Sequence, residues 1–195
     1  MNFFQKDFST HLQEAWNVDT KVTSASIQAG GDDYNTITSL AVRQVFGALE
    51  LVGTQDKMYM FMKEISSNGN TQTIDVVFPM HPAILFFNPN LMKLLMDPMY
   101  ENQESGHYPN KWSIHDLGTH FPNATGHADG GDESMPVEEC GNMLIMTLAY
   151  AQRTGDNAYL TQHYAKLESW AGFLVNESLI PANQLSTDDF AGILA

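Results

Sequence analysis

A long polar segment, residues 104 to 135, interrupts a chain whose other patterns are mostly helical. It ends at Pro136, where a largely apolar helical pattern begins. Its histidines and acids include His107, His115, Asp116, His120, His127, Asp129, Asp132 and Glu133. Segments of this length without secondary structure are uncommon inside compact domains and usually carry function. We therefore expect a site where this segment meets the helix that starts at Pro136.

Apolar residues at helical spacing predict most of the remaining structure. The expected helices cover residues 8–16, 34–52, 82–95 with an extension to 102, 136–153, 157–176, and a start near 186. Gly155-Asp156 joins two of them tightly, which is typical of an antiparallel helix pair. Asn68-Gly69 lies between the apolar runs 58–65 and 73–78 and predicts a β-hairpin. The helices expected at 34–52 and 136–153 are apolar on most sides and should be buried, whereas the helix at 157–176 has one polar face. Buried and half-exposed helices in alternation indicate a double-layered helical array.

The formal net charge of −14 limits the partners of the chain. Like charges repel nucleic acids and anionic membranes, so neither is expected to bind. No apolar run reaches the length of a transmembrane helix. The first 16 residues lack the basic and apolar regions of a signal peptide. Cys140 is the only cysteine, so an internal disulfide is excluded.

Three acidic pairs each stand where a helix is expected to begin, namely Asp32-Asp33, Glu138-Glu139 and Asp188-Asp189. Acids at these positions commonly satisfy free N–H groups and the positive end of the helix dipole. If the helices form the inner ring of an array of hairpins, their N-termini share one end and the pairs converge. Two carboxylates across a pocket can then divide the work of base and proton donor. Capping and catalysis both remain open at this stage.

The histidines of the polar segment predict no metal site and no cofactor. Their spacing fits no compact zinc signature such as HExxH, and the acids near residue 130 do not follow a calcium-binding EF-hand loop. Hydrogen bonding to the loop backbone is expected instead. Cys140 lies one turn into an apolar helix and is expected to be inert packing rather than a nucleophile. Asn142 shares a helix face with Glu138, where it either orients a substrate amide or serves helix packing.

Two sequons, at Asn123 and Asn176, are candidate N-glycosylation sites. Beyond these, five long strings carry a family resemblance: GDDYNTITSLAVRQVFGALELVG, KEISSNGNTQTIDVVFPMHP, ENQESGHYPNKWSIHDLGTHFPNATGH, MPVEECGNMLIMTLAYAQRTGD and LIPANQLSTDDFAG. They closely resemble the fungal glutaminase A family over almost the whole chain from about Gly30. The resemblance implies a secreted hydrolase that converts L-glutamine to L-glutamate and ammonia.

The same resemblance implies a fold. The C-terminal domain of the family looks like the (α/α)6 toroid of six-hairpin glycosidases, and its members are several times longer. We therefore expect residues 1–29 to be a linker or the end of an upstream region. Residues 30–195 are then the N-terminal part of a truncated (α/α)6 domain with a β-hairpin insertion, a mainly α fold.

Family motifs and residue chemistry together give a candidate active site for a small-molecule substrate, glutamine. The expected catalytic acids are Glu138, Glu139, Asp188 and Asp189. One carboxylate of the first pair activates water, and one of the second pair protonates the leaving ammonia. The expected substrate-binding residues are His115, Asp116, Asn142 and Arg43. The alternatives are an inverting glycoside hydrolase on the same toroid or an inactive fragment.

Overall fold

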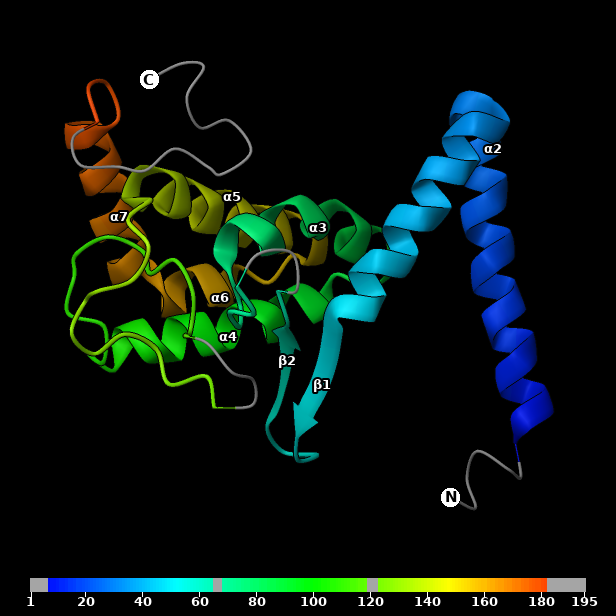
Figure 1. Cartoon of the computed structure of the whole chain (residues 1–195), viewed down its shortest axis with the longest axis horizontal. Helices are drawn as coiled ribbons and strands as arrows, with labels where there is room; N and C mark the ends of the chain where they lie inside the picture. Colours follow the sequence, from blue (N-terminus) through cyan, green and yellow to red (C-terminus); the bar gives the residue numbers. More distant parts are fainter. Residues whose placement is uncertain (1–6, 65–67, 119–122, 182–195) are drawn as a thin grey trace. The chain divides into compact units, whose positions relative to one another are not determined.

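The computed structural model describes residues 7–64, 68–118 and 123–181 (Figure 1). The chain divides into two compact units, Met1–Gly47 and Ala48–Ala195. Nearly all of helix α2 (Phe8–Ala48) lies in the first unit, with a kink at Gly31 where φ is 79° and ψ is −165°. Side chains rarely adopt this φ, so a glycine is favoured here. The sequence predicted separate helices over 8–16 and 34–52, whereas helical structure also covers residues 17–33 and is interrupted by this kink. A domain boundary between residues 29 and 30 stays a prediction.

The two arms of α2 contact each other across the kink. Ser26 Oγ and Thr38 Oγ1 lie 2.6 Å apart in a hydrogen bond, and Val22 is buried beside them. The arm after the kink was expected to be buried, but Ile37 and Leu40 are 66% and 58% exposed within the described chain. Its helical period was identified correctly and its burial was not.

The second unit begins with a two-stranded antiparallel sheet of β1 (Leu49–Gly53) and β2 (Met58–Met62). Two predictions fail here, because residues 49–52 are strand rather than helix, and β2 pairs with β1 rather than with residues 73–78. The tight turn after Gly53, where φ is 111°, brings the strands together. Past Asn68-Gly69 the chain makes one isolated bridge, Lys63 to Thr71, and then enters a helix.

Five helices follow in the described part of the second unit: α3 (Ile74–Phe87), α4 (Asn90–Glu104), α5 (Pro136–Thr154), α6 (Asn157–Gln162) and α7 (Tyr164–Glu177). The helix expected to open at Pro82 instead begins at Ile74 and contains that proline. The helix expected over 157–176 is divided at His163. The prediction for α5 is confirmed, since proline occupies its first turn and the left-handed Gly155 ends it.

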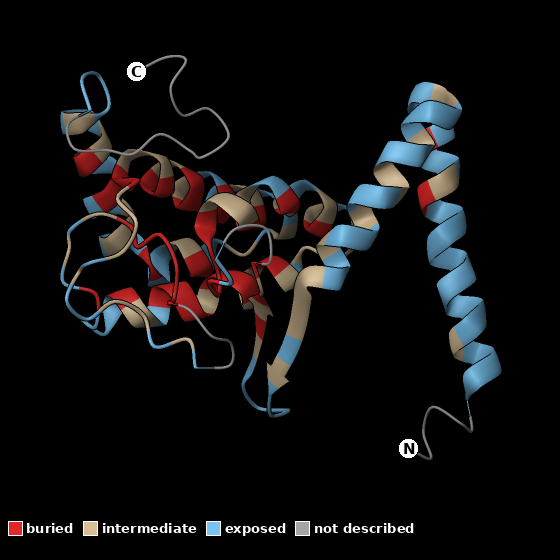
Figure 2. Ribbon diagram, viewed as in Figure 1, coloured by how far each residue is buried: buried red, intermediate tan, exposed pale blue. Residues whose placement is uncertain are grey.

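The core of this unit lies between α3, α4, α5 and α7, where Figure 2 shows buried residues on facing sides of the helices. Tyr100 of α4 is fully buried, and its hydroxyl makes a 2.6 Å hydrogen bond with Thr147 of α5. The ring of Tyr100 stacks on His163 at 3.8 Å and packs near Trp170 of α7. This hydrogen bond and these ring contacts together join α4 to α5 and α7. None of the described helices combines the length and apolarity needed to cross a membrane.

A buried stretch of the polar segment, residues 113–118, is fixed by backbone hydrogen bonds. Leu117 N–H donates to Thr71 O at 2.8 Å, and Ile74 N–H donates to His115 O at 2.9 Å. Gly118 O accepts from Thr71 N–H at 2.9 Å. The stretch is thus held against the residues that lead into α3, which brings its side chains to the start of that helix.

Candidate active site

Carboxylates from two helix starts meet one histidine of the polar segment. His115 Nε2 lies 3.7 Å from Asp75 Oδ1 in the first turn of α3, and 3.8 Å from Glu133 Oε2 just before α5. Glu139, in the first turn of α5, places a carboxylate oxygen within 4.8 Å of the ligand atoms of both Asp75 and His115. Glu138 precedes it in the same turn. We call Asp75, His115, Glu133, Glu138 and Glu139 the acidic cluster.

Asp116 fixes the orientation of His115. One carboxylate oxygen of Asp116 lies 2.7 Å from His115 Nδ1, and the other lies 2.8 Å from His127 Nε2. Asn70 and the Gly118 N–H donate to the same carboxylate. Burial would raise the pKa of Asp116, but these hydrogen bonds outweigh burial and lower it. The carboxylate therefore stays ionised and holds Nδ1, which leaves Nε2 of His115 toward the acidic cluster.

The acids around His115 raise the pKa of its imidazole. Burial alone would lower the pKa of His115, but the hydrogen bond and charge of Asp116, together with Asp75 and Glu133, outweigh burial and raise it. The backbone of His115 is also fixed, because its N–H donates to Asp132 Oδ2 at 2.7 Å. Tyr108 donates its hydroxyl proton to the other oxygen of Asp132 at 2.9 Å.

The neighbouring acids Glu138 and Glu139 differ sharply in environment. Glu139 is 0% exposed, and Asn142 donates to its Oε2 at 3.2 Å. Its Oε1 is buried without a hydrogen-bond partner among the described residues. Burial, followed by the charge of Asp75, raises the pKa of Glu139 well above its ordinary value. Glu138 is half-buried, and burial and Asp75 raise its pKa while His115 opposes the rise. Of this pair, Glu138 alone presents side-chain surface to solvent.

Four predicted site residues are therefore close together: His115, Asp116, Glu138 and Glu139. Asn142 is buried and bonded to Glu139, so its substrate role stays untested. Arg43 lies in the first unit, and its substrate role likewise stays a prediction. Asp188 and Asp189 lie outside the described residues, as does His120. The convergence of the three acidic pairs on one mouth is accordingly untested.

Two residues of the cluster were missed from the sequence. Asp75 was overlooked because the helix it starts was expected to begin at Pro82; an acid in a helix first turn was the available signal. Glu133 was noted only as one acid of the loop. The loop hydrogen bonding expected of the histidines holds for His107, whose Nε2 lies 2.9 Å from Thr125 O. His115 and His127 bind the Asp116 carboxylate instead.

Cys140 is buried in α5, and the Ser113 N–H donates to its sulfur at 3.2 Å. Burial raises the pKa of this thiol to about 12, which agrees with the expected packing role. The sequon residues Asn123 and Asn176 are both exposed, and their glycosylation stays a prediction.

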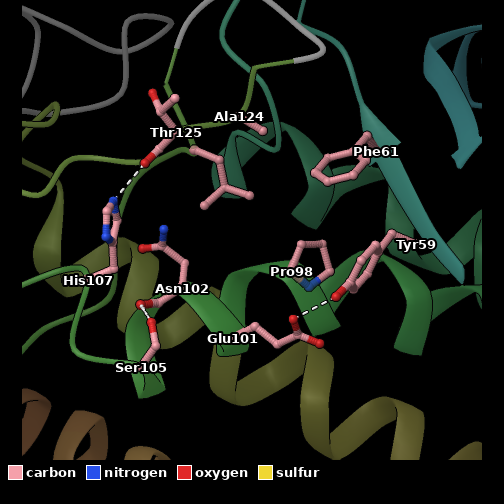
Figure 3. A pocket seen from close by; sticks show the side chains of 10 residues that line it. Tyr59, Phe61, Pro98, Glu101, Asn102, Ser105, His107, Ala124 and Thr125 are labelled. Carbon is pink, nitrogen blue, oxygen red and sulfur yellow. Dashed lines mark hydrogen bonds between the residues drawn. The ribbon is translucent and has the colours of Figure 1, made fainter. Parts of the chain in front are cut away.

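A separate pocket of about 470 Å³ lies between β2, α4 and the polar segment (Figure 3). Tyr59 and Phe61 enter it from the same face of β2, and Asn102 and Glu101 enter it from α4. Glu101 Oε2 accepts from the Tyr59 hydroxyl at 2.6 Å and from Lys57 Nζ at 3.0 Å. The pocket thus combines two aromatic rings with hydrogen-bonding groups, and it is not lined by the acidic cluster.

The fold and the cluster define a helical-hairpin domain with carboxylates and histidine gathered at helix starts. Residues 31–195 match the family described as the glutaminase A six helical-hairpin domain, and the chain belongs to this family. It is 57% identical to the glutaminase A of Aspergillus oryzae over all 195 residues, which cover 28% of that protein. It is 40% identical to a probable glutaminase of Arthroderma benhamiae, with 86% of this chain and 26% of that protein aligned. No solved structure gives a significant match.

These findings confirm the family resemblance and the mainly α fold of a partial six-hairpin domain. Both relatives are much longer than this chain, which spans 28% and 26% of them.

Proposed function

We propose that the chain supplies the acidic site of a glutaminase-type amidohydrolase that converts L-glutamine to L-glutamate and ammonia. Membership of the glutaminase A six-hairpin family and the names of two relatives support the reaction class. The observation that carries the proposal is Glu138, an accessible carboxylate at the start of α5 beside a histidine oriented by Asp116. Asp75 lies against the same histidine.

In the proposed reaction Glu138 acts as the general base. Water attacks the side-chain amide carbon of glutamine while its proton passes to Glu138. The C–N bond then breaks, and the nitrogen leaves as ammonia after it gains a proton from a second acid. Asp188 or Asp189 remains the proposed donor. His115 and Asp116 orient the acids, and Glu139 is supported by Asn142 beneath them.

Ammonia release from L-glutamine by the complete protein tests this function. Oligosaccharide hydrolysis is assayed in parallel, and L-asparagine serves as the matched shorter amide. We expect ammonia from glutamine with enzyme-dependent kinetics and no reducing sugar. Absence of ammonia from a well-folded complete protein overturns the proposal.

A glycoside hydrolase is the second candidate, favoured by the pocket that contains Tyr59 and Phe61. Partly exposed aromatic rings beside polar groups are suited to sugar rings, and separated carboxylates serve inverting hydrolysis. Reducing sugar without ammonia in the parallel assays supports this candidate over the first.

We further propose an extracellular location, based on the family resemblance and the exposed sequons. The proposal is tested by comparing the gel mobility of the naturally produced protein before and after treatment with a glycosidase that removes N-linked glycans. Substituting Asn123→Gln and Asn176→Gln separately identifies the modified residue, and no shift in the unsubstituted protein contradicts the proposal.

A further inference from the structure

We propose that Asp75, His115 and Glu139 bind a divalent transition-metal cation, Zn²⁺ or Mn²⁺, with Glu133 beside the site. This site lies beyond the proposed amide hydrolysis and does not rest on it. The sequence predicted no metal because spacing rules count residues along one segment. Here the ligands come from the start of α3, the stretch 113–118, and the start of α5, so their spacing in sequence carries no signal.

The distances between the ligand atoms fit a metal ion. Tetrahedral coordination at about 2.1 Å places ligand atoms about 3.4 Å from one another. His115 Nε2 lies 3.7 Å from Asp75 Oδ1 and 3.8 Å from Glu133 Oε2. A carboxylate oxygen of Glu139 lies within 4.8 Å of the ligand atoms of Asp75 and His115. The His115–Asp75 pair needs to close by only a few tenths of an ångström, whereas the Glu139 side chain needs to move by at most about 1.4 Å to reach coordination distance.

The histidine is already oriented for coordination. Its Nδ1 is 2.7 Å from Asp116 Oδ2, which leaves Nε2 directed toward the carboxylates. Histidines that bind metals commonly give their other nitrogen to a carboxylate, which fixes the ring and increases its basicity. Asp116 is itself held by His127 and by the Gly118 N–H. The support around His115 therefore extends to a second layer of residues.

Glu139 supplies an observation independent of the clustering. Its side chain is 0% exposed, and its Oε1 has no hydrogen-bond partner within the described ranges. Burying a carboxylate oxygen without a partner is costly. A bound cation would satisfy this oxygen. The Asp75 and Glu133 side chains are 21% and 31% exposed, so the site also has access to solvent and room for a water ligand.

The donor set selects the class of metal. One imidazole nitrogen with carboxylate oxygens suits Zn²⁺ and Mn²⁺, whereas Ca²⁺ and Mg²⁺ prefer oxygen ligands alone. Without a thiolate in the set, Cu(I) and iron–sulfur clusters are disfavoured. The strongly negative surroundings further favour a divalent cation.

Metal content and metal binding of the complete protein test the inference. The protein is purified without chelators and its metals are measured by mass spectrometry. It is then stripped with chelator and titrated calorimetrically with ZnCl2 and with MnCl2 separately. We expect about one site per chain for at least one ion, and a rise in melting temperature on binding. Binding no tighter than that of the cluster variants below overturns the inference.

Substitutions locate the site. His115→Ala and Glu139→Gln should each lower the affinity at least 100-fold, and Asp116→Asn should lower it about 10- to 100-fold through the orientation of His115. His107→Ala is the matched control, because that histidine is exposed, its Nε2 hydrogen-bonds to the backbone of Thr125, and it lies outside the acidic cluster. If a buried variant fails to fold, Asp75→Asn at the partly exposed ligand gives the readout. Unchanged binding in folded Asp75→Asn and Glu139→Gln contradicts the assignment.

The two proposals fail in different ways. Metal bound at this cluster without ammonia release from glutamine overturns the proposed function and supports the site. Ammonia release by a protein that binds neither ion overturns the site and supports the function.

Discussion

Glu138 and Glu139 are adjacent at one helix start and have the same side chain, but their environments differ. The first is half-buried and the second is completely buried. Glu138→Gln should lower kcat/KM for glutamine by about 10²- to 10⁴-fold, because a general base is lost. The melting temperature should change little, since the substituted glutamine side chain has almost the same volume as glutamate. Ammonia release and a thermal melt measure both quantities. Glu168→Gln on the exposed face of α7 is the control, and near-control turnover in Glu138→Gln contradicts the assignment.

The buried thiol of Cys140 gives a second prediction at this scale. Its side chain is 0% exposed and has no access to a substrate. A thiol reagent should modify the native protein very slowly and the denatured protein at once. Cys140→Ser should keep turnover within a few-fold of the parent protein. Rapid modification that abolishes ammonia release would instead make this cysteine a nucleophile.

Sequence prediction of single residues succeeded where the residues share a short segment and failed where they do not. His115-Asp116 and Glu138-Glu139 are adjacent pairs with visible chemistry, and the structure brings both pairs together. Asp75 lies 40 residues before His115 in the chain. Its place in the cluster depends on how the backbone of residues 71–74 pairs with the stretch 113–118, which no local pattern records.

At the scale of elements, local signals predicted α5 correctly, but they predicted helix where β1 forms and the wrong start for α3. Pro136 and Gly155 delimit α5 because each restricts the backbone at a helix end. Residues 49–52 continue the helical period of α2, yet residues 49–53 pair with β2, since strand formation depends on a partner elsewhere in the chain. The run before Pro82 is rich in Val and Phe but forms a helix that packs against α5.

The joint between α5 and α6 depends on Asp156. This side chain accepts from the Tyr159 N–H at 3.2 Å, as an N-cap of α6, and from the Tyr150 hydroxyl at 2.9 Å. Asp156→Ala should lower the free energy of unfolding by about 1–2 kcal/mol. Asp156→Asn should retain most of the stability, because asparagine also caps. Urea unfolding of the complete protein measures both variants, and equal losses in the two would show that charge rather than capping is involved.

The contact between β2 and α4 should depend on pH through Glu101. Burial would raise the pKa of this carboxyl, but hydrogen bonds from Tyr59 and Lys57 outweigh burial and lower it. A carboxyl with a lowered folded pKa stabilises the fold above its unfolded pKa, and this contribution is lost as the pH falls through the folded value. Glu101→Gln should therefore cost about 0.5 kcal/mol at pH 7, because the group is half exposed, and progressively less as the pH falls through the folded pKa of Glu101. Urea midpoints measured at pH 7 and at successively lower pH test this; a cost that does not fall with pH contradicts the ionic origin.

At the scale of the whole molecule, the described chain leaves an apolar groove of about 300 Å³ between α5, α6 and α7. Leu144, Leu160 and Leu167 line it, and Ile145 and Leu148 beside them are 51% and 48% exposed. Contiguous apolar surface of this kind normally contacts other protein. The chain spans only 28% of the length of the Aspergillus oryzae relative, which offers ample sequence for such a contact.

Residues 1–195 expressed alone should therefore bind an apolar fluorescent dye and associate with increasing concentration, although the charge of −14 slows association. The complete protein should do neither. Leu148→Gln should reduce dye binding by the short chain, whereas in the complete protein it should lower stability, because a covered leucine is lost. Val175→Gln is the control, as Val175 is 83% exposed and lies outside the groove. Size-exclusion chromatography, dye fluorescence and thermal melts decide the matter. A monomeric short chain with a cooperative melt and no dye binding would mean that the groove is stable in water without a partner.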